Sequence, residues 1–399
     1  MKKRIIILMH YLELGGAEMA LIGLLHALDQ EKVHVDLFIY DHRGPLMRFI
    51  PKWINLLPQI DAYAVIERPL FEALKHGHIG VVYGRLSAKY KHHSFLKKHI
   101  EGDRHSSLIQ YVGDCVTPWL PMINPRVEYD LCISFLTPHN IGRDKVNARK
   151  KIAWIHTDYS TVNIDTDSEL RVWEAYDNIV SISPQVTKAF ANKFPSLASQ
   201  IIEIENMLPS DYIASRSKEF DVVNEIHGDP KLLSIGRLCT AKNYDNVPDI
   251  AKRLVNTYYP GLRWYIIGSG IDESLIRQKI AVAGMEEHVI LLGKKDNPYP
   301  YIKACDIYVQ PSRFEGKSIT VREAQLLGKP VVVTNYPTAS SQIRDGEDGV
   351  IVPLSNDGCA RGLADFISNT RLRQYIISNL KKDDFATIGE VNKIYDLLK

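Results

Sequence analysis

Cysteine is scarce in this 399-residue chain, and its five cysteines are scattered. Their number is odd and no two have C-x-x-C spacing, so the sequence predicts neither a disulfide framework nor a zinc site. We expect reduced, mostly buried thiols in a cytoplasmic protein. Long apolar runs are also missing, and without a run of about 18 apolar residues no membrane-spanning helix is predicted. The basic and apolar start has too short an apolar part for a signal peptide, so we expect a buried strand there.

Neither sign of charge dominates the chain. The 49 basic and 47 acidic residues leave a formal net charge of +2, which gives no reason to expect a nucleic-acid partner. Hydrophobic residues make up 45% and charged residues 24%, the balance of a soluble globular protein. This composition excludes collagen-like, mucin-like and wholly disordered classes. At typical domain sizes the length corresponds to about two or three domains.

Short β-branched runs alternate with amphipathic stretches along the chain, which predicts βα units and parallel sheets. In the first half we expect a helix at 17–28 and strands at 4–10, 34–40, 129–135, 151–156, 178–182 and 200–205. In the second half we expect strands at 231–235, 263–267, 289–292, 306–310, 330–334 and 350–352, and helices at 244–258, 273–283, 299–304, 320–327 and 359–368. The predicted fold class is therefore α/β, with two doubly wound domains.

A polar, weakly patterned stretch at residues 209–229 predicts a linker between the two domains. We expect domains at residues 1–210 and 211–380, followed by a helical tail at 381–399. Doubly wound sheets bind ligands at the carboxyl ends of their strands, so the expected site is a cleft between the domains.

Glycine pairs follow two of the predicted strands. Gly15 and Gly16 stand at a strand-to-helix turn, where a ligand can approach closely and helix amides can meet a phosphate. The G-x-G-x-x-G fingerprint of a dinucleotide site is absent, and a tight turn that needs positive φ is an equally good alternative. At Gly268-Ser269-Gly270, which holds only a fragment of the fingerprint, a turn is the favoured interpretation.

The strongest signal is the segment PSRFEGKSITVREA at residues 311–324, where a strand, a glycine-containing loop and a helix start follow one another. Amides at such a helix start stabilise an anionic phosphate. Glu315 in the loop and Glu323 in the helix could accept hydrogen bonds from the hydroxyls of two sugars. The alternative, favoured on spacing alone, makes Thr320 and Glu323 a capping box and Glu315 a solvated loop acid.

Two further strand ends carry cationic or titratable residues. Arg237 and Lys242 follow one strand, and a guanidinium fork with an ammonium suits a diphosphate, although two exposed surface cations are the commoner case. His156 could bond a substrate hydroxyl or phosphate or move a proton, although a lone histidine is more often structural. No Ser-His-Asp or His-x-x-x-His pattern stands out, so neither a hydrolase triad nor a metal site is predicted.

In this order and at these strand ends, the four segments resemble the retaining glycosyltransferases of family 4, which have the GT-B fold of two Rossmann-like domains facing across a cleft. The resemblance covers nearly the whole chain. It is strongest from residue 233 to 353, through the Glu-x7-Glu pair, the Phe-Glu-Gly loop, the Gly-Arg-Leu…Lys segment and GEDGV at 346–350. It makes residues 1–210 an acceptor-binding domain and 211–380 a nucleotide-sugar-binding domain, with the tail packing back on the first.

The resemblance implies a retaining, metal-independent transferase without a cofactor. The donor would be a nucleotide sugar, with UDP as the expected nucleotide and a hexose or N-acetylhexosamine as the sugar. The acceptor would be a glycan, a lipid-linked sugar or a surface polymer of the cell envelope. Two alternatives remain: another nucleotide-sugar enzyme of this fold (an epimerase or phosphorylase), and a non-catalytic partner protein that binds a sugar nucleotide.

The resemblance also implies roles for the matched residues. Arg237 and Lys242 would bind the diphosphate and stabilise the leaving nucleotide. Glu315 would contact the donor sugar near its reacting carbon, and His156 would bond the sugar or phosphate there. Glu323 would hold the ribose hydroxyls. The implied donor-binding set is Gly16, Arg237, Lys242, Gly293, Lys294, Glu315, Gly316, Lys317, Ser318, Ile319 and Glu323, with Arg237, Lys242, Glu315 and His156 as the catalytic members.

Three places depart from the commonest pattern of the family. Asn243 stands where glycine is usual, Asn206-Met207 stands where Asn-Gly is frequent, and the loop reads Glu-Gly-Lys-Ser rather than Glu-Gly-Phe-Gly. These departures bear on the placement of the donor sugar more than on the reaction class.

Residues 71–105 form a basic segment that we expect to be helical. Its cations alternate with apolar side chains: Arg85, Lys89, Lys91, Lys97 and Lys98 with Leu86, Tyr90 and Phe95. Such a segment could lie on an anionic membrane surface, a peripheral contact at the inner face of the cell membrane that would suit a lipid-linked acceptor. The alternative is a solvated charged face.

Overall fold

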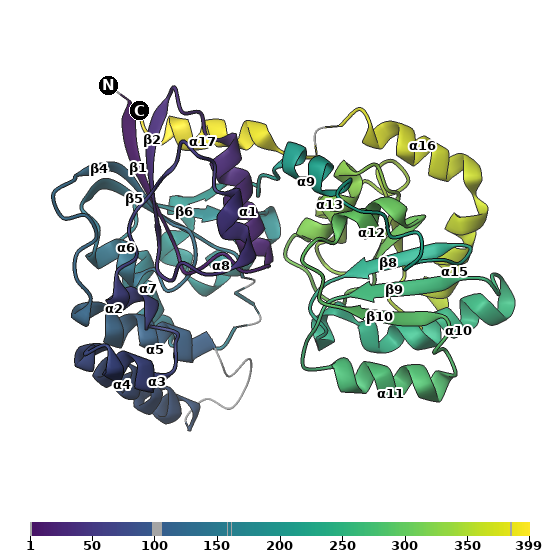
Figure 1. The fold of residues 1–399 in the computed structure, drawn as a ribbon, viewed down its shortest axis with the longest axis horizontal. Helices are drawn as coiled ribbons and strands as arrows, with labels where there is room; N and C mark the ends of the chain where they lie inside the picture. Colours follow the sequence, from purple (N-terminus) through teal and green to yellow (C-terminus); the bar gives the residue numbers. More distant parts are fainter. Residues whose placement is uncertain (1, 98–105, 158, 161, 384) are drawn as a thin grey trace. The chain divides into compact units, whose positions relative to one another are not determined.

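The computed structural model describes all residues except 1, 98–105, 158, 161 and 384. The chain divides into two compact units (Figure 1). Unit 1 comprises Met1–Met207 with Ile388–Lys399, and unit 2 comprises Leu208–Thr387.

Unit 1 is built on a seven-stranded parallel sheet in the order β3-β2-β1-β4-β5-β6-β7. Its strands are β1 (Lys3–Met9), β2 (Val33–Ile39), β3 (Asn55–Leu56), β4 (Tyr129–Ser134), β5 (Ala148–Trp154), β6 (Asn178–Ser181) and β7 (Ile201–Glu203). Its helices are α1 (Gly16–Ala27), α2 (Asp61–Ala64), α3 (Leu70–Lys75), α4 (Ile79–Leu96), α5 (Ser106–Val116), α6 (Asn140–Asp144), α7 (Thr166–Trp173), α8 (Pro184–Lys193) and α17 (Val391–Asp396).

Unit 2 repeats this plan with a six-stranded parallel sheet in the order β10-β9-β8-β11-β12-β13. Its strands are β8 (Lys231–Ile235), β9 (Arg263–Ile267), β10 (Val289–Gly293), β11 (Ile307–Gln310), β12 (Val331–Thr334) and β13 (Val350–Val352). Its helices are α9 (Ser210–Arg216), α10 (Val247–Thr257), α11 (Glu273–Ala283), α12 (Tyr299–Ala304), α13 (Ile319–Leu326), α14 (Ala339–Gln342), α15 (Asn356–Ser368) and α16 (Thr370–Leu380).

Both sheets run outward in two directions from a central pair of strands. In unit 1 the chain leaves β1 toward β2 and β3 and then returns to β4. In unit 2 it leaves β8 toward β9 and β10 and then returns to β11. This is the doubly wound order, and ligands of such sheets bind outside the carboxyl ends of the strands where the direction reverses. The expected α/β class with two Rossmann-like sheets is confirmed.

Buried apolar side chains explain why these segments pair as central strands. Residues 5–9 of β1 are fully or almost fully buried, as expected for a parallel sheet covered on both faces. In unit 2, the cluster around Trp264 and Leu254 joins the sheet to α10 and α15. The tail helix α17 packs in unit 1, where the hydroxyl of Tyr395 accepts a hydrogen bond of 2.8 Å from the Asp29 amide.

The predicted strands and helices are found with small shifts at their ends, and two expectations were wrong. The stretch expected to be a linker contains α9, whose Ile213 is fully buried, so it is part of unit 2 rather than a flexible connection. The helix expected from residue 244 begins at Val247, because a 3₁₀ turn at Tyr244–Asn246 precedes it.

Candidate functional site

Two of the segments singled out in the sequence meet at the strand reversal of unit 2. β8 leads into residues 236–243 and β11 leads into residues 311–318, and these two strands pair directly, with Ile307 opposite Leu232. Parallel neighbours end at the same edge of a sheet, so the two loops start side by side. Their contacts define the candidate site.

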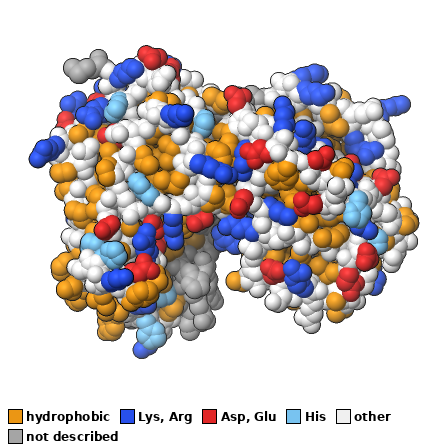
Figure 2. Space-filling view, viewed as in Figure 1, with side chains coloured by type: hydrophobic (Ala, Val, Ile, Leu, Met, Phe, Trp, Pro, Cys, Tyr) orange, Lys and Arg blue, Asp and Glu red, His pale blue; other side chains and the backbone are white. Residues whose placement is uncertain are grey.

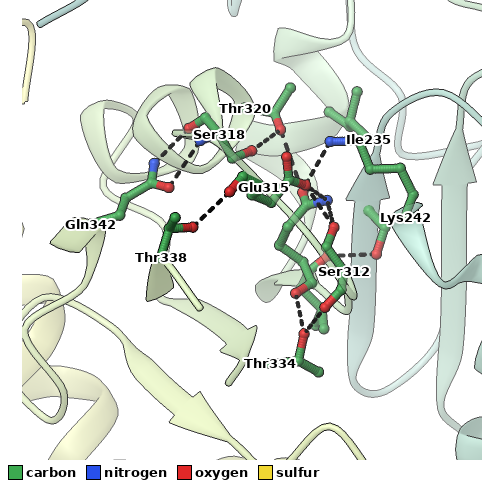
Figure 3. A network of polar contacts seen from close by, with 12 residues as sticks. Ile235, Lys242, Ser312, Glu315, Ser318, Thr320, Thr334, Thr338 and Gln342 are labelled. Atoms are coloured by element: carbon green, nitrogen blue, oxygen red, sulfur yellow. Dashed lines mark hydrogen bonds and ion pairs between the residues drawn. The ribbon is translucent and has the colours of Figure 1, made fainter. Parts of the chain in front are cut away.

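A partly buried ion pair joins the two loops. The ammonium Nζ of Lys242 lies 2.6 Å from Oε1 of Glu315, whose side chain is only 9% exposed (Figure 3). Lys242 ends a short 3₁₀ turn, and Asn243 then adopts the left-handed conformation with φ 61°. Asparagine is one of the few residues that tolerate this conformation, so Asn243 can hold this turn where the family's commonest residue is glycine.

The carboxylate of Glu315 is held at one oxygen. Besides Lys242, Oε1 accepts hydrogen bonds from the Ser312 hydroxyl at 2.6 Å and from Nε2 of Gln310 at 3.1 Å (Figure 3). Among the described residues none donates to Oε2, so this oxygen remains able to accept from a ligand. The alternative of a solvated loop acid at this position is therefore wrong.

A second charged contact ties the loops together. Arg313 forms a two-pronged pair with Asp245, with nitrogen–oxygen distances of 2.8 and 2.9 Å, and also donates to the Thr240 carbonyl at 2.6 Å. Burial by itself would raise the pKa of Asp245, but the hydrogen bond and charge of Arg313, with help from Lys279, hold that pKa below its ordinary value. This contact fixes the loops without using the predicted site cations.

Arg237 is the exposed cation of the site. It follows β8 directly, and no hydrogen bond or ion pair links its guanidinium to any residue that the structure describes. The two cations at the strand reversal thus differ in their contacts: Lys242 forms an ion pair with Glu315, whereas the guanidinium of Arg237 faces solvent.

Helix α13 starts at the site, but one of its predicted amides is already used. Ser318 precedes the helix, and its amide donates to Oε1 of Gln342 at 3.0 Å, while Nε2 of Gln342 donates back to the Ser318 carbonyl at 2.6 Å (Figure 3). A phosphate could take this amide only by displacing Gln342. The amide of Ile319 lies in the first turn, where helix amides lack an intrahelical acceptor.

Glu323 lies buried in α13 and contacts the start of α12. Its Oε1 accepts a hydrogen bond of 2.9 Å from the Tyr299 hydroxyl, and burial raises the pKa of its carboxyl to about 7. The capping-box alternative is wrong, because Ser318 is the N-cap residue and no side-chain cap bond forms there. A buried carboxylate with one spare oxygen can accept from ligand hydroxyls.

The loop after β10 borders the same region of unit 2. Gly293 has φ 70°, a conformation that favours glycine, and Lys294 beside it is exposed. Asn297 anchors the loop, because its side-chain amide donates to the Arg216 carbonyl at 2.9 Å.

The Gly268-Ser269-Gly270 turn after β9 needs glycine for close packing, because a Cβ at Gly268 would lie 1.9 Å from the Gly236 carbonyl oxygen.

Gly16 and His156 belong to unit 1. Gly16 is the first residue of α1, and neither it nor Gly15 has positive φ, so the alternative of a turn that needs positive φ is wrong. His156 follows β5 and packs against the rings of Phe135 and Trp154. Burial lowers the pKa of His156 to about 3, so its imidazole is neutral near pH 7 and is available as a hydrogen-bonding group.

Several contributors were missed from the sequence. Gln310, Tyr299 and Gln342 orient the predicted residues without being part of a motif, and Ser312 lies in the 311–324 segment but was given no role there. A polar residue at the end of an apolar strand, as in Tyr308-Val309-Gln310, was the available signal for Gln310. Tyr299 and Gln342 come from segments distant in sequence from their partners, which spacing cannot reveal.

Among the residues that the structure describes, no group of three or more His, Cys, Asp or Glu side chains is placed to hold a metal ion. None of the helices that the structure describes is long and apolar enough to cross a bilayer.

Residues 215–383, the part that contains the candidate site, match the family model "Glycosyl transferases group 1". An N-acetylgalactosaminyltransferase of Campylobacter jejuni, named for a diphospho-undecaprenol acceptor, is 30% identical over 173 residues, which are 43% of this chain and 46% of the relative. An Escherichia coli alpha-1,3-galactosyltransferase named for UDP-Gal and GlcNAc-diphosphoundecaprenol is 24% identical over 41% of this chain and 43% of the relative. The alignments thus span less than half of either relative.

Solved structures resemble the chain over its full length. Anabaena HepE in complex with UDP and glucose has a TM-score of 0.68 at 17% identity, over 99% of this chain and 98% of that one. TarM has a TM-score of 0.67 at 14% identity, over 100% of this chain and 99% of that one. At such low identity the likeness concerns the fold, and it agrees with the expected GT-B class.

Proposed function

We propose that this protein is a glycosyltransferase that moves a hexose or N-acetylhexosamine from a UDP-sugar to an acceptor with retention of configuration. The observation that carries the proposal is the convergence of Lys242, Glu315 and the start of α13 at the strand reversal of unit 2, beside exposed Arg237. This chemistry fits a nucleotide diphosphate joined to a sugar, and it lies within the matched family segment.

Each group has a part in donor binding. Arg237 and Lys242 would neutralise the pyrophosphate, aided by the Ile319 amide at the helix start. Glu323 would accept from the ribose hydroxyls, and the loop after Gly293 would lie against the base. Oε2 of Glu315 would accept from a sugar hydroxyl, while Ser312 and Gln310 keep Oε1 in place.

Charge compensation drives the transfer in this proposal. As the bond between the sugar and phosphate lengthens, negative charge grows on the pyrophosphate and positive charge on the reacting carbon. Preorganised cations stabilise the first charge, which is usually the largest catalytic contribution. The acceptor hydroxyl attacks on the face that the nucleotide leaves, and the leaving phosphate takes its proton. Because protein cations supply the compensation, we expect no metal requirement: EDTA should leave turnover unchanged.

The proposed acceptor rests on the acceptors that appear in the names of two relatives. Two of them carry diphospho-undecaprenol acceptors in their names, so we propose a lipid-linked glycan acceptor for this chain. For such an acceptor we propose a cytoplasmic enzyme that works at the inner face of the cell membrane.

A thermal-shift screen of the full chain against UDP-, GDP- and ADP-sugars tests the donor. We expect selective stabilisation by UDP-sugars, because a ligand that binds only the folded state raises the unfolding temperature. The anomeric configuration of the product or of slow donor hydrolysis, followed by proton NMR, tests retention. No stabilisation by any sugar nucleotide would overturn the proposal, and binding without turnover would favour a non-catalytic partner protein.

A further inference from the structure

One end of unit 1 exposes an unusual number of large apolar side chains. Seven of them are each more than half exposed. We name this surface the α3–α4 face, and it consists of Phe71, Leu74, Ile79, Tyr83, Leu86, Tyr90 and Trp119. Figure 2 shows hydrophobic side chains beside histidines and cations at this end of the unit. Soluble proteins rarely expose so many large apolar groups together without a binding role.

Helical spacing explains why four of these side chains form a stripe. Ile79, Tyr83, Leu86 and Tyr90 recur at intervals of four, three and four residues along α4, which places them on one side of the helix. The opposite side of α4 is buried: Val81 and Ala88 pack inward. The helix therefore has its apolar packing partner on one face and a second apolar stripe on the other.

Trp119 joins the stripe from a different segment. Its ring lies over Gly80, where a Cβ would come within 2.4 Å of the indole, and its centroid is 5.9 Å from that of Tyr83. A glycine is thus required for this ring to lie against α4. Tyrosine and tryptophan, with an apolar body and a polar tip, are the side chains favoured at a membrane–water interface.

The charge around the stripe has one sign on α4. The helix contains no Asp or Glu, and Lys89, Lys91 and Lys97 are exposed beside the stripe or at its end. Of the acids on the neighbouring helices, Glu72 lies 3.8 Å from Arg68, and Asp61 lies 4.0 Å from a ring nitrogen of His76. Asp114 on α5 accepts hydrogen bonds from the side chains of Asn140 and Ser168. An apolar stripe with lysines along its edges complements an anionic lipid surface.

We propose that the α3–α4 face docks unit 1 on an anionic phospholipid bilayer, with the tyrosines and Trp119 at the interface and the lysines at the headgroups. This goes beyond the proposed sugar transfer, because it concerns a surface of unit 1 that needs no nucleotide sugar.

The structure changes which residues of the basic segment take part. Arg85 points inward, donating to the carbonyls of Val65 and Arg68, so it is not a membrane contact. Phe95 packs against the Tyr111 ring rather than outward. Lys98 lies outside the described residues. Ile79, Tyr83 and Trp119, which the sequence did not single out, replace them.

Vesicle co-sedimentation of the full chain, without donor or acceptor, tests the proposal. We expect binding to mixed phosphatidylglycerol and phosphatidylcholine vesicles at low salt, and little binding to phosphatidylcholine alone. The variant Tyr83→Ser/Tyr90→Ser should lower the partition constant about tenfold through lost interfacial insertion. Lys89→Glu/Lys97→Glu should lower it by about as much, because each lysine near an anionic surface contributes.

The matched control is Ile271→Ser/Val282→Ser in unit 2. These two side chains are 91% and 81% exposed and lie outside the α3–α4 face, so their replacement should leave vesicle binding unchanged. UDP-induced thermal stabilisation of every variant, measured in parallel, reports on the nucleotide site and on folding. A variant that loses vesicle binding and keeps its UDP response has lost only the docking surface.

Three results would overturn the proposal. In the first, the wild-type chain does not bind anionic vesicles at low salt. In the second, both variants of the face bind vesicles as well as the wild type does. In the third, the Tyr83→Ser/Tyr90→Ser variant has a lower sedimentation coefficient than the wild type in the absence of vesicles. The last result would assign the face to a second copy of the chain instead. Failure of the sugar-transfer proposal would appear separately, as a missing UDP response in a chain that still binds vesicles.

Discussion

The two units share one topology but carry different side chains at their strand reversals. In unit 2 the strands end in cations and a carboxylate, with Lys242 and Glu315 paired and Arg237 exposed. In unit 1, His139 follows β4 and His156 follows β5, and burial lowers the pKa of both to about 3. At the ends of β1 and β2, however, Nδ1 of His10 lies 2.5 Å from Glu67, and Arg43 lies 3.3 Å from Asp41. The same doubly wound order thus presents different groups in the two units. In unit 2 these are an ammonium, a guanidinium and a carboxylate, the groups on which the proposed diphosphate site rests.

The largest effect is expected from removing Lys242, the cation of unit 2 that is paired with Glu315. We expect Lys242→Ala to lower turnover about 100-fold, because loss of one preorganised group that stabilises transition-state charge has this size of effect. The initial rate of transfer or of donor hydrolysis measures it. Lys252→Ala, which removes an exposed lysine of α10, is the matched control and should have wild-type turnover. An unchanged rate for Lys242→Ala would remove this residue from the mechanism.

A second change separates charge from shape at the same site. Glu315→Gln keeps the size of the side chain but removes the negative charge that pairs with Lys242. We expect turnover to fall about tenfold or more, since the sugar hydroxyl loses an ionised acceptor. UDP affinity should not weaken, because a carboxylate has left the surroundings of a diphosphate. Titration calorimetry with UDP checks this, and weaker UDP binding would contradict the assignment of Glu315 to the sugar.

Each unit also buries one glutamate, which allows a matched comparison of pH dependence. Burial raises the pKa of Glu169 in unit 1 and of Glu323 in unit 2 to about 7, and tyrosine hydroxyls donate to both. A carboxyl whose pKa is raised on folding contributes stability that is present below about pH 4.5. That contribution is lost as the pH rises toward 7.

Glu323→Gln and Glu169→Gln should therefore each gain stability relative to wild type as the pH rises from about 5 to 8. The gain should be on the order of 2 to 3 kcal/mol, measured by denaturant unfolding. Only Glu323→Gln should reduce the stabilisation by UDP, since only Glu323 is proposed to hold the ribose. An equal loss of the UDP response in both variants would show that these glutamates act on the fold and not on the ligand.

Local patterns in the sequence predicted most strands and the positions of Arg237, Lys242, Glu315 and Glu323. Both the spacing of apolar residues and the position of a residue at the end of a strand can be recognised within a short stretch of sequence. α16 was missed because it follows α15 after the single residue Asn369, whose side chain accepts from the Leu372 amide and starts a new helix. The expected linker contained α9, because burial of Ile213 outweighs the polar composition of the stretch.

The supporting contacts of the site could not be predicted in the same way. Gln342 reaches Ser318 across 24 residues, and Tyr299 reaches Glu323 across a similar distance along the chain. Such pairs depend on how strands and helices pack and not on spacing. The neutral state of His156 likewise depends on surrounding rings that are distant in sequence, so the sequence suggested proton transfer where the structure leaves a neutral hydrogen-bonding group.

The smallest predicted effect concerns the backbone that presents Lys242. Asn243 has φ 61°, and its Oδ1 accepts a hydrogen bond of 2.7 Å from the side chain of Asn246. Asn243→Gly and Asn243→Ala both lose this bond, so the difference between the two variants isolates the cost of placing a Cβ in the left-handed region. We expect Asn243→Ala to be less stable than Asn243→Gly by about 1 kcal/mol in denaturant unfolding. Equal stabilities would mean that the turn relaxes, and wild-type turnover in both would then show that Lys242 does not depend on this conformation.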